Sequence, residues 1–142
     1  MRRVIAVLGL ALIVILPALA LAKPMKEKPE KPFQNAQELL KWINDYRKNP
    51  EPRRAPEAVK AMSAQGSIRE VDQSGVYIGF VAGVLGSNPE MADDLISKMF
   101  PLPPEDQVLI VKAIAYSGLP RWRDTMAKFV ERMPARKVLI DK

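Results

Sequence analysis

Residues 80–99 read F-V-A-G-V-L-G-S-N-P-E-M-A-D-D-L-I-S-K-M, and residues 110–129 read I-V-K-A-I-A-Y-S-G-L-P-R-W-R-D-T-M-A-K-F. Each block begins with an apolar helical run, passes through a turn that contains serine, and opens a second helix near a proline. Ser87 recurs as Ser117, and Pro89 recurs as Pro120. Proline suits the first position of a helix, where its missing N–H costs no hydrogen bond. The blocks therefore predict two successive helical hairpins.

The apolar positions of the two second helices also correspond. Met91 pairs with Trp122 and Leu95 with Met126, although Lys98 falls opposite Phe129. A weaker third copy covers residues 39–62 around an Asn-Pro turn. Periods of about 30 residues are typical of stacked helical hairpins. The alternative is the loose self-similarity that any compact helical protein with proline turns shows.

This layout resembles the tetratricopeptide and HEAT-type repeat proteins over residues 35–134. The likeness is one of architecture, because the consensus residues of those repeats are missing. It implies an α-solenoid-like stack. The wording G-F-V-A-G-V-L-G-S-N-P over residues 79–89 and I-A-Y-S-G-L-P over residues 114–120 also looks like a group of exported bacterial proteins with no known activity, and so implies no reaction.

We expect an all-α domain over residues 35–142, with five or six short helices packed as antiparallel hairpins. Asn35 and Glu38 have the spacing of a capping box at the first helix start, and Gly66 and Gly118 suit left-handed helix ends. The apolar stripe of the first helix is read as Leu39, Leu40, Ile43 and Tyr46, flanked by Trp42. The later helices are expected to start at Pro56, near residue 72, at Pro89, at Glu105 and at Pro120, with a final short helix over residues 135–142.

Residues 72–86 contain a stripe of glycines. Gly75, Gly79 and Gly83 are spaced by four, so they share one face of a helix. A strand is the alternative, because valine, tyrosine, isoleucine and phenylalanine favour strands. The helix is preferred because of the spacing and because no partner strand is predicted. We interpret the stripe as a close contact between two helix backbones, or else as one side of a groove for an apolar ligand or a partner helix.

The N-terminus has the pattern of a secretory signal peptide over residues 1–22. Two arginines precede an uncharged apolar run over residues 4–22, and Ala20 and Ala22 place small residues before the expected cleavage site. We expect export to the periplasm or the medium, with no membrane span after cleavage. The alternative is an uncleaved helix that anchors the protein in the inner membrane, because the apolar run is close to the length that spans a bilayer.

Residues 23–34 are expected to form a disordered linker. Lysine, proline and glutamate dominate them, and such a stretch buries too little apolar surface to offset its ordering entropy. Cleavage after Ala22 would leave residues 23–142 with a net charge of +4. A chain of that length suits a single domain with a modest core.

The side chains of common catalytic chemistry are scarce. The chain has no cysteine and no histidine, so it lacks thiolate nucleophiles, disulfides, and the commonest general base and metal ligand. No phosphate-binding loop, dinucleotide fingerprint or nucleic-acid signature is present. The acidic pairs at residues 93–94 and 105–106 are interpreted as complements to helix dipoles. We expect no enzyme activity, no metal, no cofactor and no nucleic-acid partner.

A positive cluster near the C-terminus is the other candidate binding feature. Arg121, Arg123, Arg136 and Lys137 are expected to meet an acidic partner. The sequence therefore predicts an exported protein-interaction or scaffold module of the cell envelope, whose partner is another envelope protein. The alternative is a small carrier that binds an apolar ligand between helices, using the glycine face and four methionines, namely Met91, Met99, Met126 and Met133.

Overall fold

A computed structural model describes residues 31–134 of the chain. Within that range six α-helices and no strand are found, so the all-α class is confirmed. Two short 3-10 turns, η1 (Pro52–Arg54) and η2 (Ser67–Arg69), flank the second helix. The α-helices are α1 (Ala36–Asp45), α2 (Ala55–Ala64), α3 (Val71–Ser87), α4 (Ala92–Met99), α5 (Val108–Tyr116) and α6 (Trp122–Val130).

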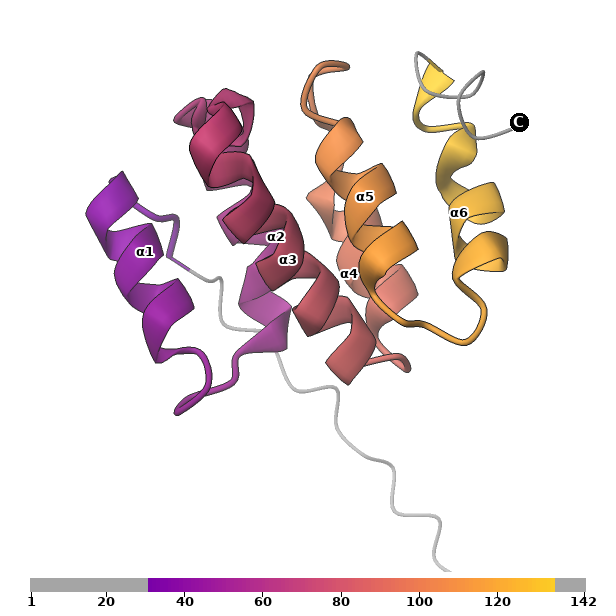
Figure 1. Cartoon of the computed structure of the whole chain (residues 1–142), viewed down its shortest axis with the longest axis horizontal. Coiled ribbons are helices and arrows are strands. Elements are labelled where there is room, and N and C mark those ends of the chain that lie inside the picture. Colours follow the sequence, from indigo (N-terminus) through magenta and orange to yellow (C-terminus); the bar gives the residue numbers. More distant parts are fainter. Residues whose placement is uncertain (1–30, 135–142) are drawn as a thin grey trace, which may run out of the picture.

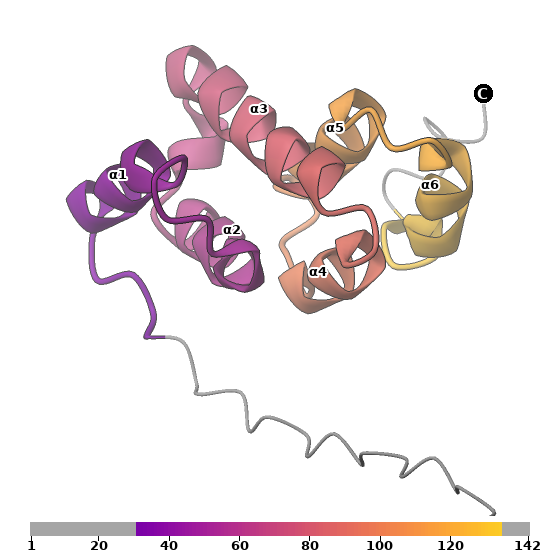
Figure 2. The ribbon, with the colours of Figure 1, turned by 90° about the horizontal axis from the view of Figure 1, so that it is seen from below.

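The helices stack as three hairpins in two layers. The hairpins are α1–α2, α3–α4 and α5–α6, and they follow one another across the molecule (Figure 1). Figure 2 shows α1, α3 and α5 in one row and α2, α4 and α6 in the other. Helix α3 packs along α5, and α2 packs along α4. The predicted repeat-like stack of hairpins is thus the architecture of the described part.

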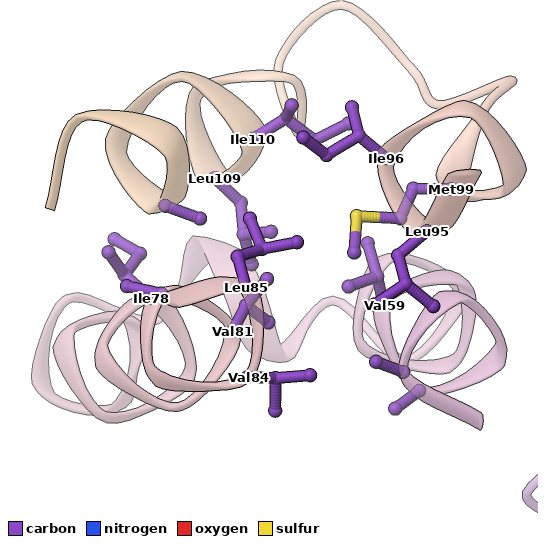
Figure 3. Packing of buried hydrophobic residues seen from close by; sticks show 14 of the residues in the cluster. Val59, Ile78, Val81, Val84, Leu85, Leu95, Ile96, Met99, Leu109 and Ile110 are labelled. Carbon is purple, nitrogen blue, oxygen red and sulfur yellow. The ribbon is translucent and has the colours of Figure 1, made fainter. Parts of the chain in front are cut away.

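The core lies between the two layers. Fully buried aliphatic side chains from α3, α4 and α5 meet there, and Leu85, Leu95 and Leu109 come from three different helices (Figure 3). Burial of such side chains is the main favourable term in folding, at about 1.5–3 kcal/mol for each large aliphatic residue. The expected inner stripe of α1 is partly wrong, because Leu40 is 39% exposed while Trp42 is buried.

The expected cap of α1 and the expected left-handed glycines after α2 and α5 agree with the structure. Asn35 Oδ1 accepts the N–H of Glu38 at 2.9 Å, and the Glu38 carboxylate accepts the N–H of Gln34 at 2.9 Å. The return hydrogen bond of the capping box thus comes from the N–H of Gln34, the residue before the cap, and not from the N–H of Asn35. Gly66 and Gly118 both have positive φ, at 75° and 72°. Glycine adopts this left-handed conformation without the Cβ clash that other residues suffer.

The expected starts of three helices are two or three residues early. Pro89 lies in a turn and α4 begins at Ala92, while Pro120 lies in the turn before α6. Asn88 does not cap α4, because its side-chain amide donates to the carbonyl of Val84 at 2.8 Å and so closes α3. Residues 104–107 likewise form a turn before α5. These prolines set the geometry of the turn and not of the first helical residue.

The linker assigned to residues 23–34 extends too far. Phe33 is buried, and its ring packs on Trp42 with 5.3 Å between ring centroids. The guanidinium carbon of Arg54 lies 4.2 Å from the centre of the Phe33 ring. This residue therefore belongs to the packed domain. An aromatic side chain that buries its ring on two partners offsets the cost of ordering the chain around it.

Several predictions fall outside the described residues. They are the signal peptide over residues 1–22 with its cleavage site at Ala20 and Ala22, the linker before residue 31, the basic residues Arg136 and Lys137, and the final helix over residues 135–142. Among residues 31–134, no helix combines the length and apolar character needed to cross a bilayer.

Candidate interaction groove

A groove of about 480 Å³ lies between the turns of the second and third hairpins. One side is formed by the α3–α4 turn and the start of α4, and the other by the α5–α6 turn and the start of α6. The lining residues are Pro89, Ala92, Asp93, Leu119, Pro120, Arg121, Asp124, Thr125 and Lys128. We call this feature the turn groove.

The turn groove is built from equivalent positions of the two repeats. The interval that separates Pro89 from Pro120 also separates Asp93 from Asp124. The exposed Pro89 and Pro120 supply apolar surface, and the nearly fully buried Ala92 and Leu119 are also among the lining residues. Repeat proteins present binding surfaces in this way, because stacking brings the same position of successive repeats side by side. The repeat that the sequence shows thus places two copies of one turn at one site.

Two ion pairs line the groove. Lys128 Nζ on α6 lies 2.5 Å from Asp93 Oδ2 on α4, and this pair joins the two helices. Arg121 Nε lies 2.7 Å from Asp124 Oδ2 at the start of α6. All four side chains are about half exposed or more, and Arg121 reaches 83%. Exposed pairs of this kind contribute about 0.2–1 kcal/mol each to stability. Because the side chains are exposed, their charged groups are accessible to a partner.

The spacing of the two turns is fixed by contacts behind the groove. A Cβ atom added to Gly86 at the end of α3 would overlap the backbone carbonyl oxygen of Ser117 at the end of α5. Only glycine permits so close an approach of two backbones. On the second layer, Phe100 and Phe129 stack with centroids 6.3 Å apart, and Arg132 Nη1 donates to the Ser97 hydroxyl at 3.0 Å.

The predicted helix–helix contact through the glycine stripe is wrong. Apart from the chain neighbours and the adjacent backbone of α3 itself, no heavy atom lies within 4 Å of a Cβ added at Gly75, Gly79 or Gly83. Gly79 and Gly83 are exposed on the outer face of α3, and the close backbone contact occurs at Gly86 instead. The spacing of four correctly predicts that the three glycines lie on one face of the helix. It did not show whether that face points to a neighbour or to solvent.

The predicted methionine lining is also not brought to this face. Met99, Met126 and Met133 are buried in the hydrophobic core, and Met91 packs against it from a partly buried position. The exposed glycines and the buried methionines therefore form no common surface. Methionine at helical spacing fills gaps in a core, as its flexible side chain allows.

Of the predicted basic residues, Arg121 lines the turn groove. Arg123 lies beside it on α6, with its guanidinium 4.5 Å from the centre of the Trp122 ring. Arg123 is not among the lining residues, so Arg121 is the one described member of the predicted basic cluster that lines the groove. Sequence reasoning missed the acidic members of the site, Asp93 and Asp124. The signal was their equivalence in the two repeats, whereas Asp93 was read only as a complement to a helix dipole.

The dipole interpretation fails completely for Asp106. This carboxylate is fully buried, accepts from Arg69 and Ser63, and lies before the start of α5. The hydrogen bond from Arg69 is the main reason why the pKa of Asp106 is held below its usual value, with the Ser63 hydroxyl adding to it against the opposing effect of burial. The same bond raises the pKa of Arg69. No local spacing in the sequence links these residues.

Among residues 31–134, no group of three or more acidic, histidine or cysteine side chains is arranged to hold a metal ion. Comparisons with protein-family models, with curated proteins and with solved structures found no significant match. An apolar floor with a rim of both charges is suited to holding a polypeptide segment.

Proposed function

We propose that this protein is a non-enzymatic interaction module that binds a segment of a partner protein in the turn groove. The observation that carries the proposal is the juxtaposition of two equivalent proline turns, with apolar floor residues and exposed charges, on a short stack of hairpins. Helical-hairpin stacks commonly use such surfaces for binding. The lining residues of the groove include no buried nucleophile or base.

The chemistry of the rim favours a partner segment that carries an acidic residue beside an apolar one. Arg121 is 83% exposed and makes one ion pair through Nε. A guanidinium has five N–H donors, so further donors remain for a partner carboxylate. An apolar side chain of the same segment would then pack on the exposed Pro89 and Pro120, excluding water from the charged contact.

The place of action proposed is the bacterial cell envelope, and the partner is another envelope protein. The support is the signal-peptide pattern of residues 1–22.

Site-specific photocrosslinking in cells tests the proposal. A photoreactive residue is placed at Thr125, which lines the groove, and a matched one at Asn44, which is exposed on α1. We expect one discrete protein adduct from position 125 and none from position 44. Adding R121E should remove most of the adduct, because the new carboxylate repels the acidic residue of the partner segment. Equal adducts from both positions, or an adduct insensitive to R121E, would refute the groove as the site.

A further inference from the structure

Two exposed prolines form the apolar surface of the turn groove that a partner can reach. Pro89 lies in the α3–α4 turn and Pro120 in the α5–α6 turn, and both line the groove. The other apolar lining residues, Ala92 and Leu119, are nearly fully buried and offer little surface. A proline ring fixes its own backbone angle φ, so neither ring has to be ordered when a partner binds.

The two prolines lie one repeat apart, and this separation selects the side chain that can contact both. Helices α3 and α5, which lead into the two turns, pack along each other. Packed helices lie about 8–10 Å apart from axis to axis, and equivalent points of the two hairpins are separated by a similar distance. Aromatic side chains are the largest apolar groups that a protein segment offers, and each buries about 150–250 Å². A flat ring can lie across both prolines, whereas a smaller aliphatic side chain contacts one of them at a time.

Arg121 is placed to cover the outer face of such a ring. It follows Pro120 directly, lines the groove, and is 83% exposed. Guanidinium groups stack on aromatic rings because the face of the ring carries partial negative charge. The start of α6 already contains this contact, since the guanidinium carbon of Arg123 lies 4.5 Å from the centre of the Trp122 ring. A saturated side chain in the groove would lack this attraction.

Stacking leaves the edge of the Arg121 guanidinium available to a carboxylate. The group is planar and its five N–H donors lie in the plane, so the stacking face and the donors act in perpendicular directions. Arg121 Nε donates to Asp124 Oδ2 at 2.7 Å. The donors of the terminal nitrogens can hold a partner carboxylate in the same plane. One arginine can therefore bind an aromatic ring and an acidic residue together.

We propose that the partner segment is anchored by an aromatic side chain, which lies across Pro89 and Pro120 and beneath the Arg121 guanidinium. This recognition rests on the proposed function of the groove, and it defines the partner motif as an aromatic residue next to an aspartate or glutamate. Aromatic anchors that fill a well-packed site commonly supply a large part of the binding energy of an interface.

Two peptide probes that differ only in aromaticity test the anchor. One is acetyl-phenylalanyl-aspartyl amide, and the other has cyclohexylalanine, whose saturated ring has a similar size, in place of phenylalanine. Each is titrated into the purified, isotope-labelled protein, and the amide NMR signals of Ala92 and Thr125, which line the groove, are followed. The aromatic peptide should shift these signals and bind about 2–5-fold more tightly than the saturated one, as expected of an exposed cation–π contact.

Two variants assign the contacts, and each has a matched control. R121A should weaken binding of the aromatic peptide and abolish its advantage, whereas R123A, on the same helix but outside the groove lining, should preserve both. P89A should weaken both peptides because it removes one ring, whereas P50A in the corresponding turn of the first hairpin should weaken neither. Circular dichroism checks that each variant is folded.

The outcomes distinguish a wrong anchor from a wrong function. Equal affinities of the two peptides, or shifts confined to residues outside the groove, overturn the aromatic anchor. An advantage of the aromatic peptide that survives in R121A contradicts the place of the ring beneath Arg121. If neither peptide shifts the groove signals while the photocrosslinked adduct at Thr125 still forms, the anchor is wrong and the proposed function stands. Loss of the adduct as well refutes both.

Discussion

Arg69 holds the buried carboxylate of Asp106 through two nitrogens, with Nε 2.9 Å from Oδ1 and Nη2 2.8 Å from Oδ2. Ser63 donates to the same carboxylate from the end of α2. The residues are 37 and 43 positions away from Asp106 in the chain. One carboxylate therefore ties α2 and η2 to the connection that leads into α5.

Removing this carboxylate should destabilise the protein strongly. D106A leaves the buried Ser63 hydroxyl and the Arg69 guanidinium without their acceptor, and we expect a loss of about 2–4 kcal/mol in the free energy of unfolding. E105A is the matched control. Glu105 is exposed and lies 3.6 Å from Arg69, so its removal should cost at most about 1 kcal/mol. Urea unfolding followed by circular dichroism measures both. Equal losses would show that the buried pair has no special role.

The same carboxylate should set an acid limit to stability. The pKa of Asp106 is lower in the folded protein than the ordinary value of about 3.9 for aspartate in an unfolded chain. Its contribution is therefore fully present above about pH 4, and it is lost as the pH falls through the folded-state pKa. The urea midpoint should stay level from pH 7 to pH 5 and decline below pH 4. The decline should be shallower in D106N. Parallel profiles for the two proteins would contradict this assignment.

Two glycines of α3 should respond in opposite ways to alanine. G86A should destabilise the protein by about 1–3 kcal/mol, because a methyl group overlaps the backbone of Ser117 and forces α3 and α5 apart. G79A meets open space on an exposed helix face and should stabilise the protein by about 0.5–1 kcal/mol through helix propensity. Thermal unfolding of both variants is the measurement. A stabilising G86A would show that the close approach is absent.

The ion pair across the groove should matter more for binding than for stability. A double-mutant cycle of D93A and K128A should give a coupling of about 0.2–1 kcal/mol in unfolding, because both side chains are about half exposed. In the crosslinking assay at Thr125, K128A should reduce the adduct with the acidic partner segment, because it removes a cation from the rim. D93A should not reduce the adduct, because it frees the Lys128 ammonium for the partner. A coupling of several kcal/mol would instead make this pair a structural element.

The parts of the fold that the sequence predicted are those with local causes. The stripe of Trp122, Met126, Phe129 and Val130 predicts α6 because an amphipathic helix has to bury one face. The glycine helix ends follow from the left-handed conformation. The predicted starts of the later helices are too early because a proline such as Pro89 suits a turn as well as a first helical residue.

The site was predictable only in part, for a different physical reason. The sequence predicts Arg121 as part of a positive cluster, but its place in a groove depends on the stacking of two hairpins. The sequence predicts Leu40 in the core because it continues an apolar stripe. Successive residues of a helix point about 100° apart, so Leu39 is buried while Leu40 is partly exposed. The partnership of Asp106 with Arg69 arises from contacts between distant parts of the chain, and no periodicity encodes such a separation.

The bare outer face of α3 has a consequence for how the central hairpin behaves in water. Gly79 and Gly83 bring no side chain to shield the peptide groups beside them. Solvent can therefore reach those carbonyls, and hydration on one side lengthens hydrogen bonds and curves a helix. In deuterium exchange, the amide hydrogens along this bare strip should exchange faster than those on the buried side of the same helix, so that α3 opens first on its outer face.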